Sequence, residues 1–361
     1  MKCLKDFEAE LNKCSKCGLC EAACPIFKIN PNDCAASKGK FIMLHGVVKG
    51  DLKLTKNINK YIDMCLKCGK CNEFCPSGID VCQILNAAKH EYMKKTLQAK
   101  LINFLESKFV FNNIINLGAI ISAPFRPKKR KSESTKVVYF KGCVNRICPR
   151  TDNYIHRIFK DTDIEIIEPD FECCGLPFLS EGNLKRFEQA AKYNLKKLDI
   201  DYDYLVTDCA SCESTILDYP EYLPQTPRIP SGKAINWGDI IAAKGLNFKF
   251  KKPVKVTFHK PCHLNNDSFF KKIIENCENV EYIEMNNYDD CCGIAGSFAL
   301  KNPALAATLA KQKAENIIKT NADYVITTCP ACIMGLKAGL ILTGSKTKVV
   351  SLLEFLAMGA D

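Results

Sequence analysis

The chain has 361 residues, of which 47% are hydrophobic and 25% charged, and its formal net charge is +11. These values are typical of a soluble globular protein and allow two or three domains. Lysines are spread along the chain rather than grouped with aromatic residues, and no nucleic-acid-binding motif is present, so we expect no nucleic-acid partner.

Cysteine is the unusual component, with 23 residues. The N-terminal segment MKCLKDFEAE lacks the apolar core of a signal peptide, which favours a cytoplasmic location. Because thiols there stay reduced, clustered cysteines are expected to be metal ligands or redox groups rather than disulfides.

Two copies of the spacing C-x2-C-x2-C-x3-C, each followed by proline, lie near the N-terminus. This is the pattern of bacterial ferredoxins with two [4Fe-4S] clusters, in which the fourth cysteine of each motif ligates the other cluster. The predicted ligands are Cys14, Cys17, Cys20 and Cys75 for cluster 1, and Cys65, Cys68, Cys71 and Cys24 for cluster 2. Zinc also suits thiolates, but two full copies make it an improbable alternative.

The segments between and after these motifs have helical patterns. FIMLHGVVKG and NINKYIDMCL place apolar residues three and four apart, and a further helix is expected from Val81 to Lys100. We therefore predict a helical dicluster ferredoxin domain over residues 1–100.

Residues 101–135 are expected to join this domain to the rest of the chain. Phe109 to Phe125 carries no charge over 17 residues and is followed by RPKKRK, so we predict an apolar helix and a basic linker. The apolar stretch is too short to span a membrane. A helix buried between the two halves is favoured over a peripheral contact with a membrane or a partner.

The C-terminal half is predicted to contain a duplicated α/β unit, over residues 136–245 and 250–361. In each copy three β-branched runs alternate with helical stretches: VVYF, IEIIE and YLVTD, then VKVTF, VEYIE and YVITT. Such alternation predicts parallel sheets. The expected fold class is thus α+β multidomain, with a helical ferredoxin domain followed by two α/β cysteine-rich repeats.

The duplication is clearest in the cysteines. Each member of a first set has a counterpart 118 to 120 residues later, and a constant shift indicates an internal repeat. The first set is Cys143, Cys173, Cys174, Cys209 and Cys212; the second is Cys262, Cys291, Cys292, Cys329 and Cys332.

These cysteines follow strands, so each copy should gather five thiols at the carboxyl end of its sheet. Five is one more than a cubane cluster or a zinc ion needs. The glycine after each Cys-Cys pair permits the tight turn that lets both thiols face one centre. A structural zinc or a metal-free redox thiol pair remains an alternative for either copy.

Several motifs resemble the glycolate oxidase iron–sulfur subunit family, which is related to lactate-utilisation, anaerobic glycerol-3-phosphate dehydrogenase and heterodisulfide reductase subunits. The matching motifs cover nearly the whole chain: GKFIMLHGVVKG, SGID, TFHKPCHL, CCGIAGSFAL, KQKAENI and ADYVITTCPAC. The resemblance implies a duplicated CCG domain and an electron-transfer subunit beside an FAD-containing 2-hydroxy-acid dehydrogenase. Electrons would pass toward a quinone or another acceptor, which could lie at the inner face of a membrane.

The heterodisulfide reductase relatives imply a further role for the repeats. There the five cysteines of each set hold a noncubane [4Fe-4S] cluster, and this chain keeps all ten. That favours, as an alternative function, a catalytic subunit that reduces a disulfide with Cys291, Cys292 and His263 as candidate catalytic residues. A second alternative is a scaffold with zinc in the duplicated half.

Two histidines lie near Cys262 in the sequence. His263 and His259 could supply a proton, but hydrogen bonding to sulfur or backbone is the favoured role. Cys148 is a candidate spare ligand; no role beyond burial is predicted for the cysteines outside the motifs, Cys3, Cys34, Cys82 and Cys277. No P-loop or dinucleotide-binding glycine motif is present, so flavin, nicotinamide and ATP are not expected in this chain.

Overall fold

The computed structural model describes residues 2–94, 134–147, 150–230 and 232–360. The predicted segment from Phe109 to Phe125, the basic linker and Cys148 lie outside the described residues, as does the end of the helix expected to reach Lys100. In the described part of the chain no helix is long and apolar enough to span a membrane.

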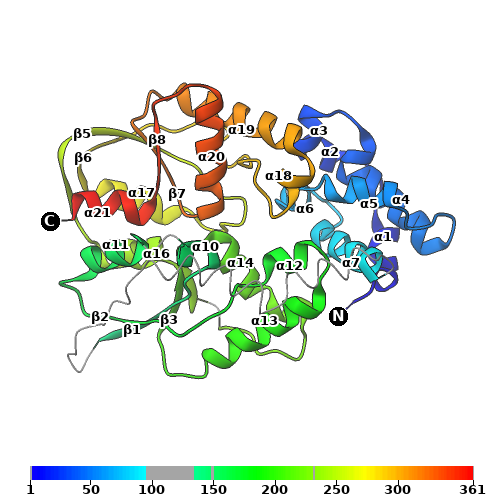
Figure 1. Ribbon diagram of the computed structural model, residues 1–361, viewed down its shortest axis with the longest axis horizontal. Coiled ribbons are helices and arrows are strands. Elements are labelled where there is room, and N and C mark those ends of the chain that lie inside the picture. Colours follow the sequence, from blue (N-terminus) through cyan, green and yellow to red (C-terminus); the bar gives the residue numbers. More distant parts are fainter. Residues whose placement is uncertain (1, 95–133, 148–149, 231, 361) are drawn as a thin grey trace.

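The N-terminal part is helical, as predicted (Figure 1). Its α4 and α5 coincide with the two segments that have helical periodicity, and α7 begins at Val81 as expected. The elements are η1 (Leu4–Phe7), α1 (Glu8–Lys13), α2 (Leu19–Ala23), α3 (Pro25–Ile29), η2 (Asp33–Ala35), α4 (Ser37–Lys49), α5 (Lys56–Asp63), α6 (Lys70–Glu73) and α7 (Val81–Lys94).

The first repeat alternates strands and helices. Its four strands pair in parallel in the order β2-β1-β3-β4. The elements are β1 (Thr135–Tyr139), α10 (Cys143–Ile147), α11 (Arg150–Phe159), β2 (Ile164–Ile167), α12 (Leu176–Ser180), α13 (Leu184–Lys197), β3 (Tyr204–Thr207), α14 (Ala210–Leu217), α15 (Tyr219–Tyr222), β4 (Ala234–Asn236) and α16 (Trp237–Lys244).

The second repeat has the same strand order, β6-β5-β7-β8, again parallel. The duplicated parallel α/β fold is thereby confirmed. The elements are β5 (Phe248–Phe258), α17 (Ser268–Glu275), β6 (Cys277–Tyr282), α18 (Phe298–Lys301), α19 (Pro303–Ile318), β7 (Tyr324–Thr327), α20 (Pro330–Leu342), β8 (Lys348–Ser351) and α21 (Leu352–Gly359).

The fourth strand of each sheet was not predicted. β4 has three residues and β8 has four, too few for a period-two pattern to stand out from the surrounding sequence. Each pairs in parallel at one edge of its sheet and leads directly into a helix, α16 or α21.

The two repeats pack through reciprocal helix pairs. α11 of the first repeat contacts α21 of the second, and α16 of the first contacts α17 of the second. Figure 1 shows these four helices between the two sheets. Trp237, at the start of α16, is buried against Tyr139 and Phe159, with ring centroids 5.7 and 5.0 Å away. One hydrophobic core therefore runs through both repeats.

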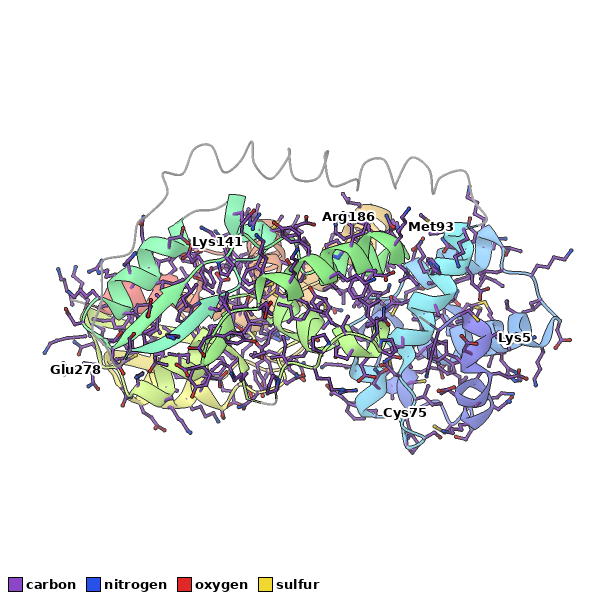
Figure 2. All side chains as sticks on the ribbon, turned by 90° about the horizontal axis from the view of Figure 1, so that it is seen from below. Lys5, Cys75, Met93, Lys141, Arg186 and Glu278 are labelled. Carbon is purple, nitrogen blue, oxygen red and sulfur yellow. The ribbon has the colours of Figure 1, made fainter. Side chains whose placement is uncertain are left out.

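The dicluster domain lies at one end of the elongated molecule. Figure 2 shows Cys75 in this domain and Glu278 at the far end of the repeats. A separate buried cluster joins the domain to the second repeat: Ile26, Ala35 and Leu66 pack with Phe298, Ala306 and Leu309.

Candidate functional site

The four thiols predicted for cluster 2 line one cavity. Cys24 comes from the first motif, and Cys65, Cys68 and Cys71 come from the second. The structure thus brings together the one-plus-three combination that the ferredoxin spacing requires. Burial raises the pKa of the Cys71 thiol to about 12, which means that the group needs a cationic partner to be held as a thiolate.

Cys14, Cys17 and Cys20, three of the thiols predicted for cluster 1, lie close together. Ser77 Oγ donates to the Lys13 carbonyl over 3.3 Å and so holds the loop after the second motif beside the start of the first. Cys14, Cys20 and Cys75 pack against the same buried cluster, and Cys17 is exposed.

In the repeats the structure brings each set of five cysteines together. Within each set, every thiol interacts with the next, and the two sets have mirror-image orders. The order is Cys143, Cys173, Cys174, Cys212 and Cys209, then Cys329, Cys332, Cys292, Cys291 and Cys262. Cys292 Sγ and Cys332 Sγ are 3.4 Å apart.

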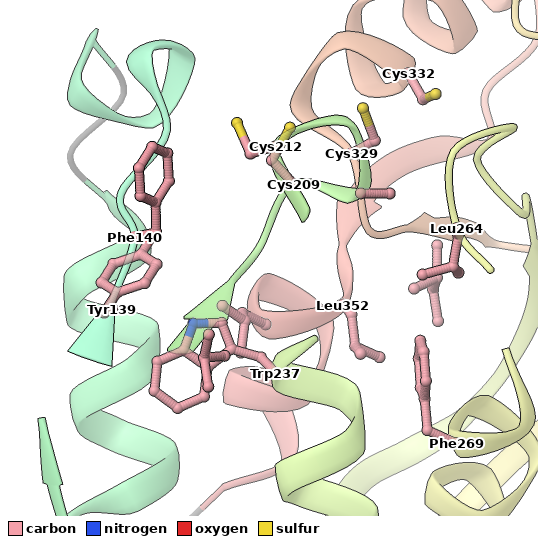
Figure 3. Close-up of a cluster of buried hydrophobic side chains, with 14 of the residues drawn as sticks. Tyr139, Phe140, Cys209, Cys212, Trp237, Leu264, Phe269, Cys329, Cys332 and Leu352 are labelled. Atoms are coloured by element: carbon pink, nitrogen blue, oxygen red, sulfur yellow. The ribbon is translucent and has the colours of Figure 1, made fainter. Parts of the chain in front are cut away.

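The two sets meet where the repeats meet. The Cys209 and Cys329 thiols interact across the boundary, and Ala210 N–H donates to the Thr328 carbonyl over 3.0 Å. Figure 3 shows Cys209 and Cys212 on one side and Cys329 and Cys332 on the other. Each of these four residues is less than a tenth exposed. We call this junction the seam.

The turn after each Cys-Cys pair requires glycine. Gly175 has φ +93°, and a Cβ there would lie 2.7 Å from the Phe187 ring; Gly293 has φ +85°, and its Cβ would lie 2.8 Å from the Ala306 carbonyl oxygen. Both the left-handed backbone and the crowding exclude larger side chains. The pair can therefore turn back toward one centre in each repeat.

Hydrogen bonds fix the first Cys-Cys pair. Asn194 Nδ2 donates to the Cys173 carbonyl over 3.1 Å, and the Tyr219 hydroxyl donates to the Cys174 carbonyl over 2.9 Å. Both side chains are buried, so these contacts are protected from water. They position the backbone and leave the thiols free to face inward.

Contacts between thiols raise the pKa of some of these cysteines and lower the pKa of others. The hydrogen bond with Cys173 raises the pKa of Cys143 well above its ordinary value, and the contact with Cys291 does the same for Cys262. Thiol donors lower the pKa of the second cysteine of each pair, Cys174 and Cys292. Those two positions are the most readily deprotonated of their pairs, and deprotonated sulfur is the form that binds metals.

The cavity predicted to hold cluster 2 lies next to the second repeat. Cys68 and Cys262 pack against the same buried cluster, and after burial the Cys262 thiol is the next largest cause raising the pKa of Cys68. Lys70 Nζ bridges the two domains by pairing with Asp290 at 2.6 Å and Asp289 at 3.2 Å. These ion pairs hold the dicluster domain against the second repeat.

A histidine connects cluster 2 to the seam. His263 Nε2 lies 3.2 Å from the Lys67 carbonyl, and His263 Nδ1 lies 2.9 Å from Ser211 Oγ. Ser211 Oγ is in turn 3.8 Å from Cys329 Sγ. Because a carbonyl only accepts, Nε2 carries the hydrogen. The prediction did not include Ser211, whose counterpart in the second repeat is Ala331.

The described cysteines outside the motifs fall into two groups, one in the cavity of cluster 2 and one away from it. Cys82 lines the cavity of cluster 2, although burial alone was predicted for it. Cys3 is exposed, Cys34 half-buried and Cys277 buried, and burial raises the pKa of Cys277 to about 12.

Family models divide the chain in the predicted order. Residues 10–79 match the 4Fe-4S dicluster domain, and residues 137–217 and 256–337 each match the cysteine-rich domain called CCG. The first match supports [4Fe-4S] clusters in the N-terminal part of the chain.

Curated relatives extend over nearly the full length. The chain is 30% identical to a fumarate reductase (CoM/CoB) subunit of Methanothermobacter marburgensis, covering 97% of this chain and 72% of that protein. It is 20% identical to the probable glycolate oxidase iron-sulfur subunit of Bacillus subtilis, covering 95% and 92%. Lactate utilization protein A of Oceanobacillus iheyensis is 25% identical over 61% of this chain and 96% of its own length.

A solved structure has a similar fold. A hypothetical protein from Helicobacter pylori superposes with a TM-score of 0.53 at 12% identity, covering 99% of this chain and 76% of that one. This likeness supports the arrangement of domains and carries no information on activity.

Proposed function

The chain belongs to the family of iron–sulfur oxidoreductase subunits that join a 4Fe-4S dicluster domain to two CCG domains, and we propose that it relays electrons between a flavoprotein subunit and a second acceptor. Its relatives include named subunits of glycolate oxidase and fumarate reductase. These support a role in electron transfer beside a partner subunit.

The observation that carries the proposal is the continuity of the cysteines. The cavity of cluster 2 adjoins the second repeat at Cys68 and Cys262, and from Cys262 the interacting thiols continue through the seam to Cys143. A continuous series of neighbouring thiols serves no purpose in a protein that binds zinc only for stability. It is what a chain of electron carriers needs, because each carrier must lie close to the next.

The chain's own residues would hold and separate the carriers. When bound, a [4Fe-4S] cluster carries one electron at a potential set by burial and hydrogen bonds to sulfur. The eight ferredoxin cysteines would hold two clusters, and each five-cysteine set would hold a further metal centre. Lys67 N–H donates to Cys65 Sγ over 3.3 Å, and Gly175 N–H to Cys173 Sγ over 3.5 Å, so backbone donors already face the sulfurs.

For the partner we propose an FAD-containing dehydrogenase of 2-hydroxy acids such as glycolate or lactate. Oxidation of the hydroxyl carbon to a ketone or aldehyde releases two electrons and two protons. The flavin would take both electrons, and this chain would pass them on singly toward a quinone or another acceptor. A relay works in either direction, so a fumarate-reducing partner would use the same residues.

The test is anaerobic affinity purification of the tagged chain from its host. The proposal expects a co-purifying flavoprotein, and addition of glycolate or lactate to that complex should reduce the chain's clusters. A chain that associates with no flavoprotein, or whose clusters stay oxidised with every hydroxy acid tried while dithionite reduces them, would contradict it.

The seam favours a second candidate, disulfide reduction. Two complete five-cysteine sets meet there, and Ser211 and His263 place hydrogen-bonding groups at Cys329. A disulfide bond needs two electrons and two protons to give two thiols, and two adjacent centres could supply one electron each. Burial of the seam thiols argues for the relay as the first choice, because a substrate needs access.

The disulfide candidate is tested with Cys291→Ala and Cys292→Ala. Each should abolish disulfide turnover while both ferredoxin clusters remain reducible. Turnover that continues unchanged in both variants would remove this candidate without affecting the relay.

A further inference from the structure

His259 lies among the thiols of the second repeat. It follows the last residue of β5, where its backbone N–H donates to the Ile326 carbonyl over 2.9 Å, and its side chain is completely buried. A ring nitrogen of His259, Cys292 Sγ and Cys332 Sγ all lie within 4.8 Å of one another. These three donor atoms are close enough to share one metal.

The imidazole of His259 lacks a hydrogen-bond partner. Neither ring nitrogen has one among the described residues, although the Tyr288 carbonyl is near enough to raise the pKa of the ring slightly. Buried polar groups are nearly always satisfied, and an exception indicates a missing water, ion or ligand. Here an unsatisfied ring nitrogen lies within 4.8 Å of both sulfurs.

A histidine binds a metal through one ring nitrogen while the other ring nitrogen carries a hydrogen. A neutral imidazole has one free lone pair and one N–H. Metal-bound histidines usually donate that N–H to a carboxylate or carbonyl, and the Tyr288 backbone lies near the ring.

The corresponding residue of the first repeat is not a histidine. Its corresponding position, three residues before the first cysteine of the set, is Phe140, which is buried and packs on Phe171 with ring centroids 4.7 Å apart. Phenyl offers no lone pair to a metal. The two sets of cysteines therefore match, whereas the groups beside them do not.

We propose that His259 is a direct nitrogen ligand of the metal centre held by the second five-cysteine set, so that the two repeats hold chemically different centres. A lone pair of one ring nitrogen forms the bond. The inference rests on the part of the proposed function that places a metal in the second repeat.

The experiment uses the whole chain, produced with 15N-histidine and with unlabelled histidine and reconstituted anaerobically with iron and sulfide. The chain has only five histidines, which limits the number of nitrogen signals. Pulsed EPR should detect one strongly coupled histidine nitrogen on the repeat centre, and the coupling should change on 15N labelling. If the centre is zinc, X-ray absorption at the zinc edge should show nitrogen at about 2.0–2.1 Å.

His259→Phe, which copies Phe140 of the first repeat, should lose this nitrogen signal. His259→Asn provides a second variant of smaller volume, and unchanged ferredoxin EPR signals verify that each variant is folded. His263→Gln is the matched control and should keep the signal, because the His263 ring already bonds Ser211 and the Lys67 carbonyl.

Three results would overturn the inference. They are a repeat centre without a strongly coupled or directly bound histidine nitrogen, a signal that persists in His259→Phe, and a second repeat that binds no metal. In the last case the part of the proposed function that places a metal in the second repeat fails as well, whereas the first two results leave that metal and the relay in place, so the two failures are distinguishable.

Discussion

Cys68 of the dicluster domain and Cys262 of the second repeat pack against one buried cluster, near enough that the Cys262 thiol raises the pKa of Cys68. The first residue belongs to the predicted cluster 2 and the second to a five-cysteine set. Their proximity makes the second repeat the neighbour of the cavity predicted to hold cluster 2, and in the proposed relay electrons would leave the dicluster domain at this point.

The crossed arrangement of the ferredoxin cysteines predicts the effect of Cys24→Ala. Although Cys24 belongs to the first motif, its replacement should remove cluster 2 and leave cluster 1, because Cys24 lines the cavity with Cys65, Cys68 and Cys71. Iron content and EPR of the reduced chain measure this. The control is Cys34→Ala, a half-buried cysteine outside the motifs that should keep both clusters. Loss of cluster 1 instead would show that the motifs are not crossed.

The contact between domains predicts that Lys70→Met slows electron transfer to the repeats. Lys70 bridges to Asp289 and Asp290 beside cluster 2, with a side chain only 15% exposed. Losing the pairs should lower the free energy of unfolding by about 1 kcal/mol and loosen the interface. Lys249→Met is the control, since its pair with Glu278 is largely exposed and far from the interface. Urea unfolding and stopped-flow reduction compare the two; equal behaviour would refute the prediction.

The buried carboxyl of Asp208 is expected to lower the free energy of unfolding in a pH-dependent way. Burial raises the pKa of its carboxyl to about 6, and Asn145 donates to one of its oxygens. Between pH 4 and 6 the folded chain binds a proton that the unfolded chain has released, so this group's contribution to stability falls as the pH rises. Asp208→Asn removes the charge and keeps the shape.

The variant should therefore be more stable than the parent by about 1–3 kcal/mol at pH 7. The difference should shrink as the pH falls from 6 to 4 and vanish below that, where the carboxyl is protonated in both states. Thermal or urea unfolding across this range measures it. A gain in stability that is independent of pH would show that ionisation of Asp208 is not the cause.

Thiol reactivity should separate the cysteines outside the motifs. Burial holds the pKa of Cys277 at about 12, so at pH 8 only about one in ten thousand of its side chains is a thiolate. Cys3 is exposed. Iodoacetamide at pH 8 should modify Cys3 quickly and Cys277 only after unfolding, as peptide mass spectrometry can show. Equal rates in the folded chain would contradict the burial of Cys277.

Cysteine spacing was enough to predict much of this molecule. The ferredoxin pattern and the constant shift between the two later sets follow from sequence, because cluster ligands and duplicated units leave fixed distances along a chain. The β-branched runs located three strands in each sheet. Short edge strands β4 and β8 carried too little pattern to be found.

The seam could not be predicted, because the contact of Cys209 with Cys329 depends on how two whole repeats pack. The differences between the repeats offered an unused signal. Aligning the copies places His259 opposite Phe140 and Ser211 opposite Ala331, and the structure puts both unmatched polar residues beside thiols of the second set. Departures from an internal repeat are a practical guide to residues with individual roles.

The central claim is that electrons enter metal centres in the repeats from the dicluster domain. The most direct measurement is anaerobic EPR during stepwise reduction, with iron, sulfide and zinc quantified, on the parent chain and on the Cys291→Ala, Cys292→Ala double variant. The account predicts more than the roughly eight iron atoms that two [4Fe-4S] clusters contain. It also predicts a further reducible EPR signal that is lost in the variant while the ferredoxin signals remain. Iron confined to two ferredoxin clusters, with zinc or no metal bound by the other ten cysteines, would contradict it.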